Sequence, residues 1–524
     1  MPTYRICLTD QIASFRLGIA FLLLLALMLG GCATLPVPPP SLPVYALPPT
    51  SDGDLQAVTH QYAGLHSPDR SGFLLLNRND DALNWRLALI DHATTAIDLQ
   101  YFIWQGDSAG SLLFKRLMLA ADRGVRVRML VDDLGFATRD KIIAAICQHP
   151  NFEIKIFNPG RVRESTLGGL GEFLIYFKEL NRRMHNKLFV ADNQLAIVGG
   201  RNIGNEYFGL KAKYNFRDID VLTVGPVVKE ISSAFDRYWN AESAYPGGAM
   251  STKVTREDLR KLMVQVTAQL ENEKKDLKSY ALEPQSWNRR LRQLPEQLKP
   301  GEAHFVQDQP TVENGEEMRL VQMLDRLAAP SHNELIILTP YLIPVGDFLK
   351  DLSRLEKEGV AVKILTGSLG SNNHTVTHSH YRKYRRRILM TGAELYEFKH
   401  DPSAAVMDQA ALPPVESKFI SLHVKALVGD RQRCFAGSLN LDPRAIDINT
   451  ENGLYIQSRE LCGAMATEFD RLMSADNAWR VGLDEKNRLF WESGEARVTL
   501  QPARGFGQRI ADFFFRLLPI ESQL

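Results

Sequence analysis

One pattern occurs twice in this chain, and it constrains the possible folds more than any other feature. Each copy has the form H-x-K-x4-D-x6-G-[GS]-x-N, the first over residues 185–202 and the second over 423–440. Several fixed spacings recur together, so an internal duplication explains the pair better than chance does. The residues shared by the two copies are His185, Lys187, Asp192 and Asn202 in the first and His423, Lys425, Asp430 and Asn440 in the second.

The segments that precede the motif also match. β-rich runs over 96–101 and 335–341 each end in Tyr, and each leads into an amphipathic helical stretch. A glycine then follows, Gly124 or Gly359, and opens an alternating run. Glycine commonly closes a helix, and alternation predicts a strand. Strand–helix–strand order in both copies predicts an α/β protein with two mixed, mostly parallel sheets flanked by helices.

The N-terminus predicts an export signal. Arg5 and Arg16 bracket a short basic region that leads into an apolar run over 17–29. The run is shorter than the about 20 residues that a spanning helix needs, but it suits a signal sequence. It ends in Leu-Gly-Gly-Cys32, which resembles the box of bacterial lipoproteins, so we expect lipidation at Cys32. A plain secretory signal or short anchor with an incidental cysteine is the alternative.

The remaining organisation follows from composition. We expect a signal peptide over 1–31 and a lipidated, proline-rich tether over 32–70. The first half of the duplication is assigned to 71–250 and a polar, helical connection to 251–310. The second half, with an amphipathic C-terminal tail, occupies 311–524. Ala33 follows the cysteine, and by resemblance to bacterial lipoproteins this favours the outer membrane, with the protein facing the periplasm of the bacterial envelope.

Charge and cysteine content exclude two classes of protein. The formal charge is +1, from 62 Lys and Arg against 61 Asp and Glu, which argues against a strongly basic nucleic-acid-binding protein. Five cysteines in 524 residues cannot form a disulfide framework. Cys147, Cys434 and Cys462 remain after removal of the leader and loss of Cys32 to lipid. We expect packing roles for them, with a Cys434–Cys462 pair possible but unsupported.

The repeated motif indicates phosphoryl chemistry. His can attack phosphorus or transfer a proton near neutral pH, and Lys is a point charge for a phosphoryl oxygen. Two copies related by a pseudo-two-fold axis would place His185 and His423 on opposite sides of one phosphorus, as in-line displacement requires. Lys is not a usual metal ligand and no zinc-site spacing is present, so we expect no metal.

The doubled motif resembles that of the phospholipase D superfamily, over about residues 75–524. The resemblance implies a bilobal fold with the active site between the halves, a covalent phosphohistidine and no cofactor. It makes His185 the nucleophile and His423 the general acid, although the sequence cannot fix that order. The residues that it assigns to binding the substrate phosphate are Lys187, Lys425, Asn202, Asn440 and Ser438.

Two carboxylates match positions that the family uses to orient its histidines. These are Asp220, after the first motif, and Glu451, after the second; a surface strand carboxylate is the alternative for each. Asp192 and Asp430 lie at turns, and we assign them a structural role. Gly200 stands where Ser is usual in the family, which could shift phosphate contacts to the backbone.

The wider pattern is similar to bacterial cardiolipin synthases of the type that lacks transmembrane helices. That similarity implies a phosphatidyltransferase that makes cardiolipin from phosphatidylglycerol and a second phospholipid, phosphatidylglycerol or phosphatidylethanolamine. Hydrolysis to phosphatidic acid, or a phosphodiesterase or nuclease activity, is the alternative on this scaffold. The expected partners are phospholipid substrates and a membrane surface, with no nucleic acid and no protein partner.

Two segments bear on membrane contact. The tail over 505–518 suits an interfacial amphipathic helix or a helix docked on the core. The basic run over 378–387 suits either an anionic lipid headgroup or solvent.

Overall fold

The computed structural model describes residues 35, 42–135, 139–160, 180–251, 253–311, 320–328, 330–518 and 520–524. The predicted signal peptide and Cys32 lie outside these residues. Within this part of the chain, no helix has the length and apolar character needed to cross a membrane.

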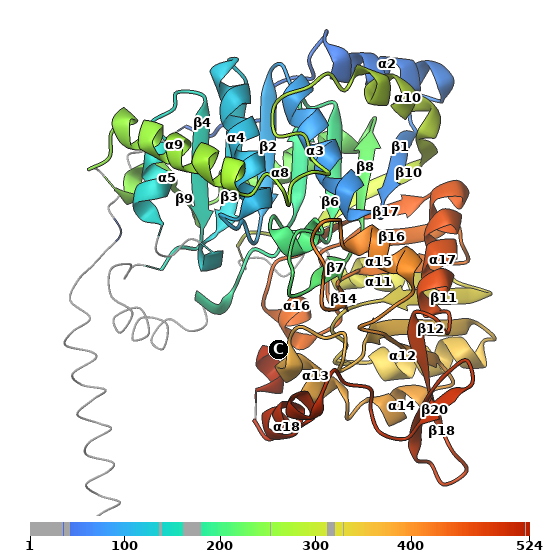
Figure 1. The fold of residues 1–524 in the computed structure, drawn as a ribbon. Helices are drawn as coiled ribbons and strands as arrows, with labels where there is room; N and C mark the ends of the chain where they lie inside the picture. Colours follow the sequence, from blue (N-terminus) through green and yellow to red (C-terminus); the bar gives the residue numbers. More distant parts are fainter. Residues whose placement is uncertain are drawn as a thin grey trace, which may run out of the picture.

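The first half is built on a sheet of eight strands that runs from β1 at one edge to β9 at the other (Figure 1). The strand order is β1 (Ser71–Leu76), β8 (Asp220–Val224), β6 (Leu195–Gly199), β5 (Leu188–Ala191), β2 (Ala96–Tyr101), β3 (Arg126–Asp132), β4 (Phe152–Phe157) and β9 (Ala244–Pro246). Its helices are α3 (Asn79–His92), α4 (Ser108–Asp122), α5 (Asp140–Ile146) and α8 (Val227–Trp239).

The second half repeats this order strand for strand. It runs β10 (Lys299–Gln307), β17 (Asn452–Gln457), β16 (Arg433–Gly437), β15 (Ala426–Gly429), β11 (Glu334–Leu338), β12 (Ala361–Gly367), β13 (Glu394–Phe398) and β18 (Ala478–Leu483), then β19 (Leu489–Ser493) and β20 (Ala496–Val498). Its helices are α11 (Leu320–Ala328), α12 (Phe348–Lys357), α13 (Thr375–Tyr381), α14 (Arg385–Leu389), α15 (Ala404–Ala410), α16 (Pro443–Asp447), α17 (Arg459–Met473) and α18 (Phe506–Phe515). The predicted duplicated α/β fold is confirmed.

The two sheets are continuous, because β1 and β10 pair with each other as antiparallel strands. All the described strands except β7 and β14 form an 18-stranded sheet that is mostly antiparallel, not two mostly parallel sheets. Parallel pairing is confined to β2–β3–β4, to β11–β12–β13, and to the small ladder of β7 (Asn215–Arg217) with β14 (Ile420–Leu422). The strand–helix–strand pattern predicts only the helix-linked parallel strands; the hairpins β5–β6 and β15–β16 are antiparallel because a tight turn joins their strands.

The register shows which residues of the two halves are equivalent. Ile97 pairs with Ala191 and Leu335 pairs with Gly429, so β2 and β11 hold the same place beside the first strand of each hairpin. This alignment makes Thr339 the counterpart of Tyr101. The match between the runs 96–101 and 335–341 through their final residues, Tyr101 and Tyr341, was therefore wrong by two positions.

Three apolar clusters form the core. One lies under α3 and α4 of the first half, and one lies under α11 and α12 of the second. The third is shared: it contains Val198 and Val221 from the first sheet, Ala436 and Leu454 from the second, and the buried faces of α8 and α17. The halves therefore pack through a common interior as well as through β1 and β10.

The segment predicted as a tether is held against the first half. Backbone N–H groups of Val44 and Ala46 donate to Asn240 and Asp236 of the α8 region, at 2.9 and 2.8 Å. The end of this segment is not extended, because residues Asp54–Leu65 form helix α2, which buries Leu55, Val58 and Tyr62. In the predicted connection, α9 (Arg256–Asn272) packs on α4 and α5, α10 (Asn288–Gln297) packs on α2, and β10 completes the second sheet.

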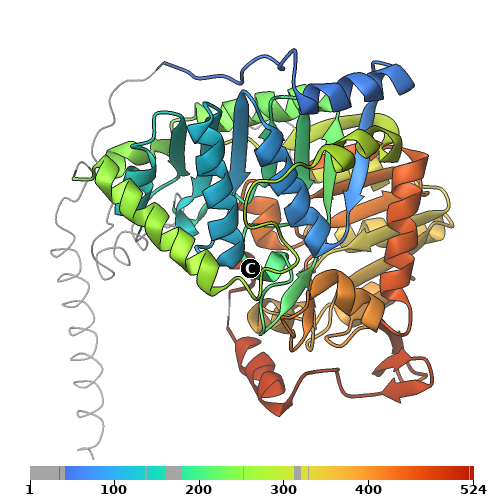
Figure 2. The same cartoon turned by 45° about the horizontal axis from the view of Figure 1, so that its top comes forward.

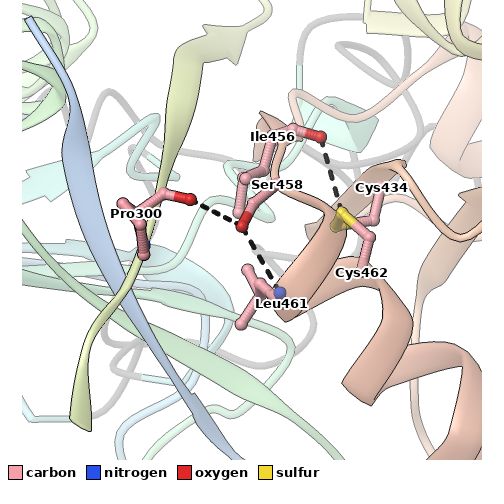
Figure 3. The surroundings of a disulfide bond; sticks show 6 residues. All are labelled: Pro300, Cys434, Ile456, Ser458, Leu461 and Cys462. Atoms are coloured by element: carbon pink, nitrogen blue, oxygen red, sulfur yellow. Dashed lines mark hydrogen bonds between the residues drawn. A yellow bond between two sulfur atoms is a disulfide. The ribbon is translucent and has the colours of Figure 1, made fainter.

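A disulfide joins Cys434 of β16 to Cys462 of α17 (Figure 3). Both residues are fully buried in the shared core. Ser458 caps the start of α17: its hydroxyl accepts from the Leu461 N–H and donates to the Pro300 carbonyl of β10 at 2.7 Å. The bond thus ties a strand of the second sheet to the helix that covers it.

Candidate active site

Each motif histidine lies just ahead of a hairpin strand and is fixed by backbone from the opposite half. The His185 N–H donates to the Thr450 carbonyl, and the His423 N–H donates to the Arg217 carbonyl, both at 2.9 Å. Parallel bridges, Met184 with Thr450 and β14 with β7, support these contacts. The two histidines therefore make equivalent backbone contacts, as the pseudo-two-fold symmetry of the fold requires.

The residue after each acceptor carbonyl supplies a carboxylate to the histidine ring. His185 Nδ1 lies 2.9 and 2.8 Å from the two oxygens of Glu451. His423 Nδ1 lies 2.6 Å from Asp218 Oδ2. Both pairs cross between the halves, and both carboxylates are fully buried. With Nδ1–H donated to a carboxylate, each ring keeps its lone pair on Nε2.

Asp220, predicted to orient a histidine, does not do so. Its carboxylate forms ion pairs with Arg86 at 3.0 Å and Arg201 at 3.3 Å, inside the first half. Asp218 takes the predicted role instead. Glu451 lies where the prediction placed it.

The strand register explains the two-residue error. Gly199 pairs with Asp220, whereas Gly437, its counterpart, pairs with Gly453. Glu451 lies two residues before Gly453, so its equivalent is Asp218. An alignment of the strands after each motif would have identified Asp218, but two aspartates, two residues apart, fit the sequence pattern equally well.

Gly200 is required by the position of Asp218. A Cβ at residue 200 would lie 2.4 Å from Asp218 Oδ1, closer than any real contact. The Gly200 N–H donates to the Ile219 carbonyl at 3.1 Å, so this backbone group is not free for a phosphate, contrary to our expectation. In the second half, Ser438 occupies the equivalent position, and its hydroxyl donates to Glu451 and accepts from the Asn452 N–H.

The two lysines lie beside the histidines of their own motifs. Lys187 Nζ donates to the His185 carbonyl at 2.5 Å, and Lys425 Nζ donates to the His423 carbonyl at 2.8 Å. Burial lowers the pKa of Lys187 to about 7 and that of Lys425 to about 8, although Glu451 and Asp218 oppose the shift. Two ammonium groups so close, with depressed pKa values, form a site suited to an anion.

Burial also acts on the histidines and their carboxylates. The pKa of each histidine is well below its ordinary value, because both rings are desolvated and both lysines repel an added proton. Burial raises the pKa of Glu451 and, less strongly, that of Asp218. At neutral pH the free site therefore holds neutral imidazoles, which are nucleophilic.

The two histidines differ at Nε2. Lys425 Nζ lies 3.1 Å from Nε2 of His423. No hydrogen bond from a described residue reaches Nε2 of His185. Nε2 of His185 is therefore less engaged by the protein than Nε2 of His423.

The asparagines flank the site unequally. Asn202 Oδ1 accepts from the Ile103 N–H at 3.2 Å, and its amide donates to the Tyr207 hydroxyl at 2.9 Å. Asn440 Oδ1 is buried and receives no hydrogen bond from a described group. Asn440 is therefore the asparagine whose side chain is less committed to the protein.

Aromatic rings form the walls. Phe102 meets the His185 ring edge-on, with centroids 4.9 Å apart. Tyr207 and Phe216 contact the His423 ring at 5.3 and 4.6 Å. Only 8% of His185 and 6% of His423 are exposed. Sequence reasoning missed Phe102 and Phe216 as site residues, because nothing in their spacing distinguishes them from core aromatics.

Asp192 and Asp430 lie at the hairpin turns, as the sequence predicted. Asp192 accepts from the backbone N–H groups of residues 94–96 and Asp430 from those of 332–334, which fixes the start of β2 and β11. Both have positive φ, at 51°. In the described ranges, no three His, Cys, Asp or Glu side chains are grouped as a metal site would need.

Comparison with known proteins identifies the family. Residues 87–239 and 323–473 each match the family model described as "Cardiolipin synthase, PLD-like domain". Cardiolipin synthase C of Escherichia coli (strain K12) is 34% identical over 484 residues, covering 87% of this chain and 96% of that protein. A cardiolipin synthase of Clostridium perfringens (strain SM101 / Type A) is 24% identical and covers 78% of this chain and 72% of its own length.

A solved structure shares the fold. The phosphatidylserine synthase of Haemophilus influenzae Rd KW20 aligns with a TM-score of 0.53 at 14% identity, covering 81% of this chain and 92% of that one. Both halves of the present chain match the family model, and each contributes a motif to the crossed histidine pairs. The chain is therefore an enzyme of the phospholipase D superfamily and belongs to the family of cardiolipin synthase PLD-like domains.

Proposed function

We propose that this enzyme is a phosphatidyltransferase that makes cardiolipin from phosphatidylglycerol and a second phospholipid, through a phosphohistidine on His185. The observation that carries the proposal is the crossed geometry of the site: each imidazole is held through Nδ1 by a carboxylate of the opposite half, and a buried lysine lies beside each histidine. The similarity to cardiolipin synthases supports this substrate class.

In the first step, Nε2 of His185 attacks the phosphorus of the donor lipid. A P–N bond forms, and the P–O bond to glycerol or ethanolamine breaks. Lys187 and Lys425 balance the charge on the phosphoryl oxygens, and the Asn440 amide adds a neutral contact. His423 gives its proton to the leaving oxygen; a bound anionic phosphate favours the protonated form of this ring, which burial disfavours in the free site.

In the second step, the terminal hydroxyl of phosphatidylglycerol attacks the same phosphorus. The now neutral His423 takes the hydroxyl proton, the P–N bond breaks, and His185 is released with Nδ1 still bound to Glu451. Acid–base assistance of this kind contributes about 10²–10⁴-fold to the rate. Water would give phosphatidic acid at this point, so the choice of acceptor decides between transfer and hydrolysis.

The test uses purified enzyme and vesicles of phosphatidylglycerol and phosphatidylethanolamine that carry different deuterated acyl chains. Mass spectrometry of the products would show which lipid donates its phosphatidyl group. We expect cardiolipin with wild-type protein and none with His185→Ala or His423→Ala. If the products contain phosphatidic acid but no cardiolipin, the enzyme is a hydrolase and the proposed transferase activity is wrong.

We also propose that the enzyme is anchored by a lipid on Cys32 and faces the periplasm, with the outer membrane favoured. The Cys434–Cys462 disulfide supports an oxidising compartment, because such bonds persist outside the cytosol. Radiolabelled palmitate incorporated by wild type but not by Cys32→Ser would support the anchor. Equal labelling of the two would exclude it.

A further inference from the structure

Helix α18 is attached to the second half by its polar side. Asp512 is the buried residue of this helix, and it lies 2.8 Å from His378 Nδ1 of α13. It also accepts from Arg382 Nη1 at 2.6 Å and from Gln501 Nε2 at 3.0 Å. The sequence left open whether the helix docks on the core or faces a membrane; its polar side docks.

The opposite side of α18 carries apolar residues into solvent. Phe506 is 76% exposed and Phe514 62%, and Ile510, Phe513 and Phe515 are exposed as well; Leu517, at 64%, and Leu518 extend this surface just after the helix. This arrangement is the reverse of a helix that covers a core. In Figure 2 the helix lies at the margin of the molecule, below the second half. An apolar surface of this kind on a folded protein marks an interaction site.

A cavity of about 460 Å³ lies next to the exposed helix face and is lined by arginines. Its charged wall consists of Arg382, Arg385, Arg386, Arg488 and Arg509, and its apolar lining includes Phe513 and Leu500. Arg386 makes no hydrogen bond or ion pair with a described side chain, and the buried Nε of Arg509 lacks a partner there. Arg382, Arg385 and Arg488 are paired with Asp512, Glu397 and Asp484.

The predicted basic run thus divides into two parts. His378 and Arg385 are buried and pair with Asp512 of α18 and Glu397 of β13, so they serve to hold these elements; of the two, Arg385 also reaches the wall of the cavity. Lys383, Arg386 and Arg387 are exposed beside α18, together with Arg504 and Arg516 of the tail.

Apolar and cationic surfaces side by side match the two layers of a lipid leaflet. Aromatic and aliphatic side chains partition below the headgroups, while arginines meet the phosphates above them. We propose that α18 and the adjoining arginine cavity dock this protein on a bilayer that carries anionic phospholipid.

The docking surface also lies near the site. His374 immediately precedes α13, on which α18 packs, and its ring lies 5.7 Å from that of Tyr341 and acts electrostatically on His423. Gln523, beyond α18, accepts from Asn181, four residues before His185, at 2.8 Å. If the proposed function holds, docking through α18 brings the leaflet to the side of the molecule on which these contacts reach the site.

The test places a tryptophan at the proposed contact in the full chain. Phe514→Trp is mixed with vesicles of phosphatidylcholine and phosphatidylglycerol whose acyl chains are brominated, and wild-type emission is subtracted. The matched control is Val264→Trp. Val264 is an apolar residue, 70% exposed, on helix α9, which packs on the first half of the molecule. We expect the added emission at residue 514 to be quenched about twofold or more, and that at 264 to be unchanged, because bromine quenches only at contact with the acyl layer.

A second variant tests the arginine cavity. Arg386→Glu should reduce quenching of Phe514→Trp on anionic vesicles, as should replacement of the anionic lipid by a neutral one. Absence of quenching at 514 in every vesicle, or dimerisation through α18 in light scattering, would overturn the proposal. Both readouts report binding without turnover, so quenching without cardiolipin would refute only the proposed function, and cardiolipin without quenching would refute only the docking surface.

Discussion

At the scale of single residues, the finding that Asp218, and not Asp220, contacts His423 leads to a prediction that compares variants of the two aspartates. Asp218→Asn keeps the size of the side chain but cannot stabilise a charged His423, so we expect kcat to fall by about 10²–10⁴-fold with little change in Tm. Asp220→Asn should instead leave Arg86 and Arg201 without their ion-pair partner and cost about 3–5 kcal/mol of unfolding free energy. Turnover and thermal unfolding of the two variants check this. A larger loss of kcat in folded Asp220→Asn than in Asp218→Asn would contradict it.

The lysine pKa values predict a pH dependence. Lys187 and Lys425 have pKa values of about 7 and about 8 in the free enzyme, and each carries its charge only below its pKa. The phosphodiester of the substrate stays anionic throughout this range. We therefore expect kcat/KM, which reports the free enzyme, to decline as pH rises through about 7 to 8. A kcat/KM that is constant or rises over this interval would show that the lysines remain protonated.

Single residues also show where sequence reasoning stops. The histidines, lysines and Glu451 could be placed because their spacing recurs. Asp218 could not be chosen over Asp220, because that choice depends on which residue faces Gly199 across β6 and β8. Phe102 and Phe216 become site residues only through folding, which brings their rings to His185 and His423.

At the scale of secondary structure, the disulfide predicts a measurable stabilisation. The loop between Cys434 and Cys462 has a sequence separation of 28, so the bond should contribute about 2–4 kcal/mol. Cys462→Ser should lower the midpoint of guanidinium unfolding relative to oxidised wild type, and reductant should have no further effect on the variant. Cys147→Ser, at a half-buried free cysteine, is the matched control. Equal midpoints for wild type with and without reductant would rule out the bond.

The helices and strands themselves were predictable to different degrees. Periodicity identified the strand–helix–strand units, because alternation and a closing glycine are local signals. The antiparallel majority of the sheet depends in part on the hairpin turns at Asp192 and Asp430, a local signal that was given no weight, and in part on the pairing of β1 with β10 across the two halves, which no local signal reveals. Helix α2 was missed because it follows a proline-rich segment that suggested an extended chain throughout.

At the scale of the whole molecule, the crossed pairs predict that a single chain holds a complete site. Equimolar mixing of His185→Ala with His423→Ala should therefore restore no activity, since neither chain contains both histidines. The measurement is cardiolipin formation in the mixture against a dilution series of wild type. If the site formed between two protomers, random exchange of subunits would restore about a quarter of wild-type turnover. Recovery of that size or more would therefore mean that the site forms between protomers.

The crossed pairs also govern when the enzyme becomes reactive during its synthesis. A ribosome releases the first half long before Glu451, so a nascent chain that carries His185 lacks the carboxylate that orients this ring. His423 meets Asp218 only after the second half has folded onto the first. A nascent chain that ends before Glu451 therefore holds neither pair complete, and a chain whose halves separate loses both histidine–carboxylate pairs at once. The fold thereby couples the orientation of both histidines to the joining of the two halves.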